Sequence, residues 1–174
     1  ISALLIERGT PGFKIGKEEK KMGLHATACT ELSFSDCMVP AENLLGVEGE
    51  GYKIALSTLD GGRVGIAAQA TGIAQGAYEQ ALAYAQQRQA FGHPIAEFQA
   101  IQFMLADMAT EIHATRCMLY DAAERSDRGE KITKEASMIK LYSSEMAGRV
   151  ADLAVQIHGG MGWMKETIVE RIYR

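Results

Sequence analysis

The chain has 174 residues, of which 47% are hydrophobic and 23% charged, a composition typical of globular proteins with a buried core. Eighteen basic and 22 acidic residues give a formal net charge of −4, and the one short basic block is GKEEKK, so nucleic acid is not expected as a partner. No apolar run approaches the ~20 residues that span a bilayer, so we also expect no membrane segment.

Cysteines and histidines show no metal or disulfide pattern. The three cysteines are odd in number and lack C-x-x-C spacing, which fits a reducing compartment. The four histidines are scattered, and we expect them to lie at the surface or to be hydrogen-bonded rather than to bind a metal. The chain begins with Ile1 and not with Met, which we interpret as an internal start, so no targeting segment is expected in it.

Residues 1–50 have the patterns of strands and turns. SALLIERG is a short apolar run closed by glycine, TPGFKIG holds turn residues, and TELSFSD alternates Leu32 and Phe34 with polar neighbours. Pro40 lacks a ladder donor and is typical of a sheet edge. This is too little β material to close a sheet, so we predict part of a β domain over residues 1–50.

From residue 51 onward the apolar period becomes helical. We predict helices from about Tyr52 to Gln89, from Glu97 to Arg125 and from Thr133 to His158, and a fourth that starts near Lys165 and is truncated at the end of the chain. The second helix has apolar residues at alternating spacings of three and four, which are Phe98, Ile101, Leu105, Met108, Ile112, Thr115, Leu119 and Ala122. The fold class is therefore mostly α, with a helical bundle domain over residues 51–174.

Two of these helices carry further packing signals. Small residues of the first helix form a stripe where another backbone could approach closely, consisting of Gly65, Ala68, Gly72 and Gly76. The apolar residues of the third helix are Met138, Leu141, Met146, Val150, Leu153 and Ile157. We expect both sets to pack in the bundle.

The segment RQAFGHPIAEFQA joins the first two long helices. Gly92 and Pro94 are expected to end one helix and begin the next, and the helix dipole alone explains Arg88 in the last turn. The dipole does not explain Phe91 or Gln99. A guanidinium can also bind a phosphate in bidentate fashion, beside an aromatic ring and an amide that meet a planar heterocycle, and both interpretations stay open.

Two other motifs contain paired glycines. In QIHGG, Gly159 is expected to end the third helix in a left-handed conformation, and Gly160 and then Gly162 leave main chain without a Cβ, which could touch a nucleotide or phosphate. In LDGGR, Asp60 and Arg63 lie one turn apart, a spacing that predicts a local ion pair. Each motif taken alone has an ordinary structural explanation.

In order along the chain, LDGGR, then RQAFG with Gln99 eleven residues after Arg88, then QIHGGMGW leading to VERIYR resemble the acyl-CoA dehydrogenase family. The preceding segment PGFKIGKEEKKMGLHATACTELSFSDCMVPAENLLGVEGEGY is similar to that family's middle β domain as it runs into the helical domain. The resemblance covers the whole chain, which corresponds to somewhat less than half of a full subunit. It is nearest to the short-chain, butyryl-type branch.

This resemblance implies an FAD-dependent enzyme that oxidises a short-chain acyl-CoA to the 2,3-enoyl-CoA and passes the electrons to an electron-transfer flavoprotein. It implies that Arg88 meets the FAD pyrophosphate and that QIHGG holds the adenosine end, both reaching into a neighbouring subunit. The cofactor-binding residues implied in this way are Arg88, Phe91, Gln99, Gln156, Ile157, His158, Gly159 and Gly160. Arg88 and Gly159 should therefore converge on one nucleotide.

The resemblance also places Asp60, Gly61, Gly62 and Arg63 along the acyl-CoA groove. In the short- and medium-chain branches the catalytic glutamate lies in a Tyr-Glu-Gly stretch beyond VERIYR, outside this sequence, so neither Glu166 nor Glu170 is assigned as the base. Another branch has its glutamate at the position of Gly62. The chain is thus expected to contain no catalytic residue and no metal site.

Members of this family are usually tetramers, formed by two dimers that pack through the C-terminal helices, and they work in the bacterial cytoplasm or the mitochondrial matrix. The alternatives to a dehydrogenase are a non-enzymatic helical oligomerisation module of the same fold, or an acyl-CoA oxidase or reductase. A Tyr-Glu-Gly stretch just beyond VERIYR would favour the enzyme over the oligomerisation module. Acyl chain length depends on pocket residues that lie partly outside the sequence.

Overall fold

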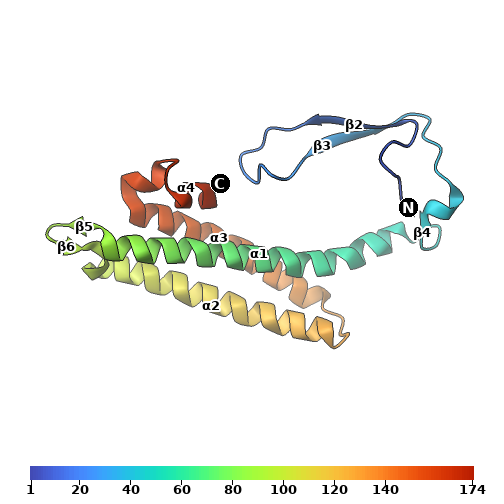
Figure 1. Ribbon diagram of the computed structural model, residues 1–174. Helices are drawn as coiled ribbons and strands as arrows, with labels where there is room; N and C mark the ends of the chain where they lie inside the picture. Colours follow the sequence, from blue (N-terminus) through green and yellow to red (C-terminus); the bar gives the residue numbers. More distant parts are fainter. The chain divides into compact units, whose positions relative to one another are not determined.

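Four α-helices make up most of the computed structural model, which describes residues 1–174 (Figure 1). They are α1 (Gly51–Gln87), α2 (Gln99–Asp127), α3 (Thr133–His158) and α4 (Ile168–Tyr173). This confirms the mostly α fold class. None of the helices combines the length and apolarity that a membrane crossing needs. Residues 1–59 and 60–174 form two compact units, which are described separately.

The first unit contains two pairs of antiparallel strands. β1 (Ala3–Leu4) pairs with β4 (Leu44–Leu45), and β2 (Phe13–Glu18) pairs with β3 (Thr30–Phe34). Phe13 and Phe34 stand opposite each other with ring centroids 4.9 Å apart. Two-stranded pairs cannot cover their own apolar side chains, and Ile15 and Leu32 remain 46% and 54% exposed. The assignment of residues 1–50 to a partial β domain stays a prediction.

Helix α1 packs through alanines rather than through the expected glycine stripe. The buried alanines of this helix are Ala67, Ala70, Ala74, Ala77, Ala81 and Ala85. A methyl side chain lets α2 and α3 approach while still giving apolar contact. Gly65 and Gly72 are exposed instead, and a Cβ added at Gly65, Gly72 or Gly76 would meet nothing within 4 Å. Close packing at these glycines is therefore not found within this chain.

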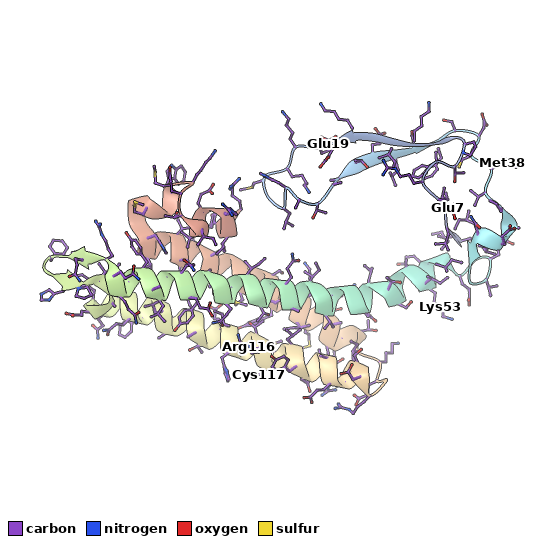
Figure 2. The ribbon with its side chains drawn as sticks, in the orientation of Figure 1. Glu7, Glu19, Met38, Lys53, Arg116 and Cys117 are labelled. Atoms are coloured by element: carbon purple, nitrogen blue, oxygen red, sulfur yellow. The ribbon has the colours of Figure 1, made fainter.

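Helix α2 buries six of the eight residues in the stripe that its spacing predicts, whereas Phe98, which precedes the helix, and Ile101 are half-buried. Leu105, Met108, Ile112, Thr115, Leu119 and Ala122 are all buried. The helix begins at Gln99 and not at Glu97, because the 3-10 turn η2 (Ile95–Glu97) precedes it. Arg116 and Cys117 are neighbours on α2 (Figure 2), but only Arg116 turns to α1, where it donates a hydrogen bond of 2.9 Å to Gln75, while Cys117 is exposed.

Helix α3 has the predicted bounds but a rotated core face. Met146, Val150 and Ile157 are buried as expected, whereas Met138 and Leu141 are 50% and 60% exposed. Ala136, Ile139 and Ser143 are buried instead, and Ile139 packs in a cluster with Ala67 of α1 and Leu119 of α2.

A bidentate ion pair joins α3 to α2. Arg149 donates from Nε and Nη2 to the carboxylate of Glu111, with a shortest distance of 2.9 Å. This hydrogen bonding raises the pKa of Arg149. Both side chains are part-exposed, so the ion pair is expected to add little to the free energy of unfolding. Its main effect is on how α3 is aligned along α2.

The chain turns back after α3 through the 3-10 segment η3 (Gly159–Trp163). Helix α4 begins at Ile168, later than the predicted Lys165, because the hydroxyl of Thr167 donates to the carbonyl oxygens of Met161 and Met164 at 2.7 and 2.8 Å and holds a turn there. Val169 of α4 is 1% exposed and closes the core cluster that also contains Ile95 and Ile157. The α1–α2 connection and the α3–η3 junction therefore lie at the same end of the bundle (Figure 1).

Candidate functional site

A pocket of about 410 Å³ brings together two of the segments that the sequence predicts to be functional. Its lining residues are Tyr84, Arg88, Ile95, Ile157, His158, Gly159, Gly160 and Met161. They come from the last turn of α1 and the residue that follows it, the start of η2 and the junction of α3 with η3. Arg88 and Gly159 thus line one pocket within a single chain.

The guanidinium of Arg88 is available to an anion. The backbone of Arg88 is fixed, since its N–H donates to the carbonyl of Tyr84 and its carbonyl accepts from the N–H of Ile95, both at 2.8 Å. Its side chain takes part in none of the ion pairs of the chain, and the acid of the same connection, Glu97, lies 3.4 Å from His93. An unpaired guanidinium in a pocket is suited to bidentate binding of a phosphate.

A tight hairpin follows Arg88. Strands β5 (Gln89–Ala90) and β6 (His93–Pro94) are joined by Phe91 and Gly92, which both have positive φ (55° and 87°), as a two-residue type I′ loop requires. Phe91 is bulky and 93% exposed, and its positive φ, which is unusual for this residue type, is imposed by the two-residue loop.

Three of the predicted cofactor residues, Phe91, Gln99 and Gln156, are not among the residues that line the pocket. Phe91 and Gln99 are exposed and do not line it. Gln99 is the first residue of α2, and its side chain makes no hydrogen bond within the chain. Gln156 is likewise exposed and lies beside the lining residues Ile157 and His158.

The paired glycines at the end of α3 leave bare main chain at the pocket. Gly159 has φ 56° and ψ −133°, so it is not left-handed helical as predicted but occupies a region that only glycine adopts readily. A Cβ at Gly159 or Gly160 would meet nothing within 4 Å. Gly162 has a different role, because its Cβ would lie 2.5 Å from the carbonyl oxygen of Val155, so this glycine serves packing.

His158 forms a wall of the pocket. It is 7% exposed, its Nδ1 lies 2.8 Å from the carbonyl oxygen of Ala154, and its ring stacks on Tyr84 with centroids 4.2 Å apart and planes 22° apart. A carbonyl only accepts, so Nδ1 carries the hydrogen, and in the neutral imidazole Nε2 is an acceptor. The residue chemistry of the sequence indicated only a hydrogen-bonded or surface histidine, since the stacking depends on how α3 lies against α1.

In the LDGGR motif, the carboxylate of Asp60 has two hydrogen-bond partners within the chain. Asp60 accepts from Arg63 at 2.9 Å, the ion pair that the spacing predicts, and from the hydroxyl of Thr133 at 2.6 Å. The Cβ positions of Gly61 and Gly62 are open. None of these residues lines the pocket of Arg88, so the structure does not bring the two predicted sites together.

A second pocket, of about 230 Å³ between α2 and α3, shows the contrast with Arg88. Two basic residues, Arg125 and Lys134, line it; Arg125 is paired with Asp121 at 3.0 Å and with Glu130 and Glu135, and the hydrogen bond to Asp121 raises the pKa of Arg125. This guanidinium is already neutralised by the chain itself.

The family model of the acyl-CoA dehydrogenase C-terminal domain matches residues 49–174. The chain therefore belongs to the acyl-CoA dehydrogenase family, which confirms the resemblance. It is 52% identical over its whole length to an acryloyl-CoA reductase (NADH) of Anaerotignum propionicum and 50% identical to a short-chain specific acyl-CoA dehydrogenase of Megasphaera elsdenii, covering 44% and 45% of those proteins.

The fold is likewise that of a solved relative. The structure of butyryl-CoA dehydrogenase from Megasphaera elsdenii superimposes with a TM-score of 0.97 at 49% identity, over 99% of this chain and 45% of that one. The chain thus spans less than half the length of the relatives that it matches.

Proposed function

We propose that this chain is the C-terminal, cofactor-binding part of an FAD-dependent acyl-CoA dehydrogenase that oxidises a short-chain acyl-CoA to the 2,3-enoyl-CoA. Family membership and the short-chain specific relative support the reaction and the substrate class. The observation that carries the proposal is the pocket in which an unpaired guanidinium faces glycine main chain. The electrons are passed on to an electron-transfer flavoprotein.

The residues of this pocket fit the nucleotide half of FAD. Arg88 would bind the pyrophosphate, and the main chain of Gly159 and Gly160 can approach phosphate or ribose because no Cβ intervenes. Tyr84 and Ile157 provide aromatic and apolar walls for a planar base. Bound FAD would supply the flavin that accepts hydride from the substrate. Phe91, Gln99 and Gln156 are proposed as further contacts at the edge of the same cofactor.

Substitution of Arg88 tests the site directly. In the full-length protein that contains this chain, we expect Arg88→Ala to weaken FAD binding about 10- to 100-fold, because a charge-assisted bidentate contact is lost. Dissociation constants would be measured from flavin fluorescence. The matched control is Arg128→Ala, which removes an exposed guanidinium paired with Glu130 at 2.7 Å and should leave FAD binding unchanged. Equal FAD affinity in both variants would remove the support for this site.

The direction of the reaction has two candidates. A reductase is favoured by the relative at 52% identity that is named an acryloyl-CoA reductase. For a dehydrogenase, anaerobic butyryl-CoA should bleach the absorption of the oxidised flavin in the full-length protein. A flavin that stays oxidised with butyryl-CoA but is bleached by NADH would instead indicate the reductase. A protein that binds no flavin would indicate the helical oligomerisation module.

Two further parts of the proposal concern substrate and assembly. Asp60, Gly61, Gly62 and Arg63 are proposed to line the acyl-CoA groove, where the open Cβ positions of both glycines leave room for a ligand. The full-length protein is proposed to be a homotetramer, a dimer of dimers, of the bacterial cytoplasm or the mitochondrial matrix.

A further inference from the structure

One nitrogen at the candidate site has no partner within the chain. Nε2 of His158 makes no hydrogen bond, although the residue is only 7% exposed. No fully buried side-chain nitrogen or oxygen in the structure lacks a partner, so Nε2 must retain contact with solvent. His158 is one of the residues that line the pocket of Arg88, so this pocket is where Nε2 is expected to reach solvent.

The orientation of this nitrogen is fixed in advance. Nδ1 is held by the carbonyl of Ala154 at 2.8 Å, and the ring is stacked on Tyr84 at 4.2 Å. A ring flip would break the bond from Nδ1 and leave the carbonyl of Ala154 facing a carbon atom. The neutral imidazole therefore presents a preset acceptor to whatever fills the pocket.

The rest of the lining decides which ligand group can meet that acceptor. Arg88 is the one lining residue with a permanent charge, and it suits a phosphate. The other side chains in the lining, from Tyr84, Ile95, Ile157 and Met161, are aromatic or apolar and suit a planar base. An N–H donor on the edge of that base is then the natural partner for Nε2.

We propose that Nε2 of His158 accepts a hydrogen bond from the 6-amino group of adenine and so selects adenine over a 6-oxopurine. The inference rests on the proposed function, in which the nucleotide half of FAD fills this pocket. In a 6-oxopurine the amino group is replaced by a carbonyl oxygen, and two acceptors would then face each other. A buried acceptor left without its donor is what makes such sites discriminate.

The test compares FAD with its deamino analogue, in which hypoxanthine replaces adenine. Apoprotein of the full-length chain is titrated with each flavin in the same buffer. We expect FAD to bind about tenfold more tightly than the analogue. His158→Phe keeps a ring against Tyr84 but removes both nitrogens, and should bring the ratio of the two dissociation constants to near one.

Two variants keep the result interpretable. Arg88→Lys should weaken the binding of both flavins and leave their ratio unchanged, because it acts on the phosphate. If His158→Phe does not fold, His158→Asn replaces it, since the amide can still donate to Ala154 but offers nothing at the position of Nε2. Equal affinities in the wild type, or a ratio that persists in the His158 variant, would overturn the inference while the FAD site stands. Failure of either flavin to bind would overturn the proposed function as well.

Discussion

At the residue scale, Gly160 and Gly162 of η3 differ in how much space a side chain would find around them. Gly162→Ala would place a methyl 2.5 Å from the carbonyl oxygen of Val155, so we expect it to lower the free energy of unfolding. The expected loss is about 1–3 kcal/mol, as for other overpacked sites. Gly160→Ala meets no atom within 4 Å and should leave stability unchanged but weaken FAD binding by intruding on the pocket. Urea denaturation and flavin titration of both variants would check this; equal stability of the two would contradict it.

A hydrogen bond from the hydroxyl of Thr133 connects the start of α3 to α1. The hydroxyl donates to Asp60 at 2.6 Å, and the carboxylate is also held by Arg63. Thr133→Val should cost about 1 kcal/mol of unfolding free energy, because a hydrogen bond to a charged group is lost. Thr110→Val is the control, since its hydroxyl only bonds the carbonyl of Ala106 in its own exposed turn. If both variants have the same melting temperature, the hydrogen bond from Thr133 to Asp60 makes no measurable contribution to stability.

Sequence patterns predict some of these residues and not others. The convergence of Arg88 and Gly159 on one pocket could be expected, because the family resemblance links the two motifs to one nucleotide. The stacking of His158 on Tyr84 could not, since it depends on the rotation of α3 about its axis. The backbone of Gly159 was predicted as a left-handed cap but has ψ −133°, because the chain continues directly into η3.

At the element scale, α1 contacts the core through a face of alanines. Ala81 is 0% exposed within the core, whereas Ala83, two residues on, is exposed. Ala81→Leu should destabilise the protein by about 1–3 kcal/mol through overpacking, while Ala83→Leu should have little effect. Thermal unfolding of the two variants measures the difference. A similar melting temperature for both would mean that α1 does not pack through this face.

Helical spacing predicts core faces well only when the apolar residues fall on one stripe. In α2 a single stripe of large side chains exists, and it is the buried one. In α3 the large residues Met138 and Leu141 lie off the core face, where smaller residues pack instead. In α1 glycines and alanines form adjacent stripes, and the methyl-bearing one is buried because glycine offers no side chain to contact.

At the scale of the whole molecule, the glycine stripe of α1 has no partner in its own chain. Gly65, Gly72 and Gly76 would each accept a Cβ without contact. We predict that another subunit packs there in the proposed tetramer, so Gly72→Leu should lower the assembly mass while the helical circular dichroism of the full-length protein is kept. Mass photometry would measure it. An unchanged tetramer would show that this face is not an interface.

The central claim is that Arg88 and the glycine main chain of QIHGG together hold the nucleotide of a flavin. The most direct measurement is an experimental structure of the full-length protein with bound FAD. We expect a pyrophosphate oxygen within hydrogen-bonding distance of the Arg88 guanidinium, and adenosine against Gly159 and Gly160 in the same pocket. FAD bound with Arg88 and Gly159 both away from the nucleotide, in every subunit of the assembly, would contradict the account.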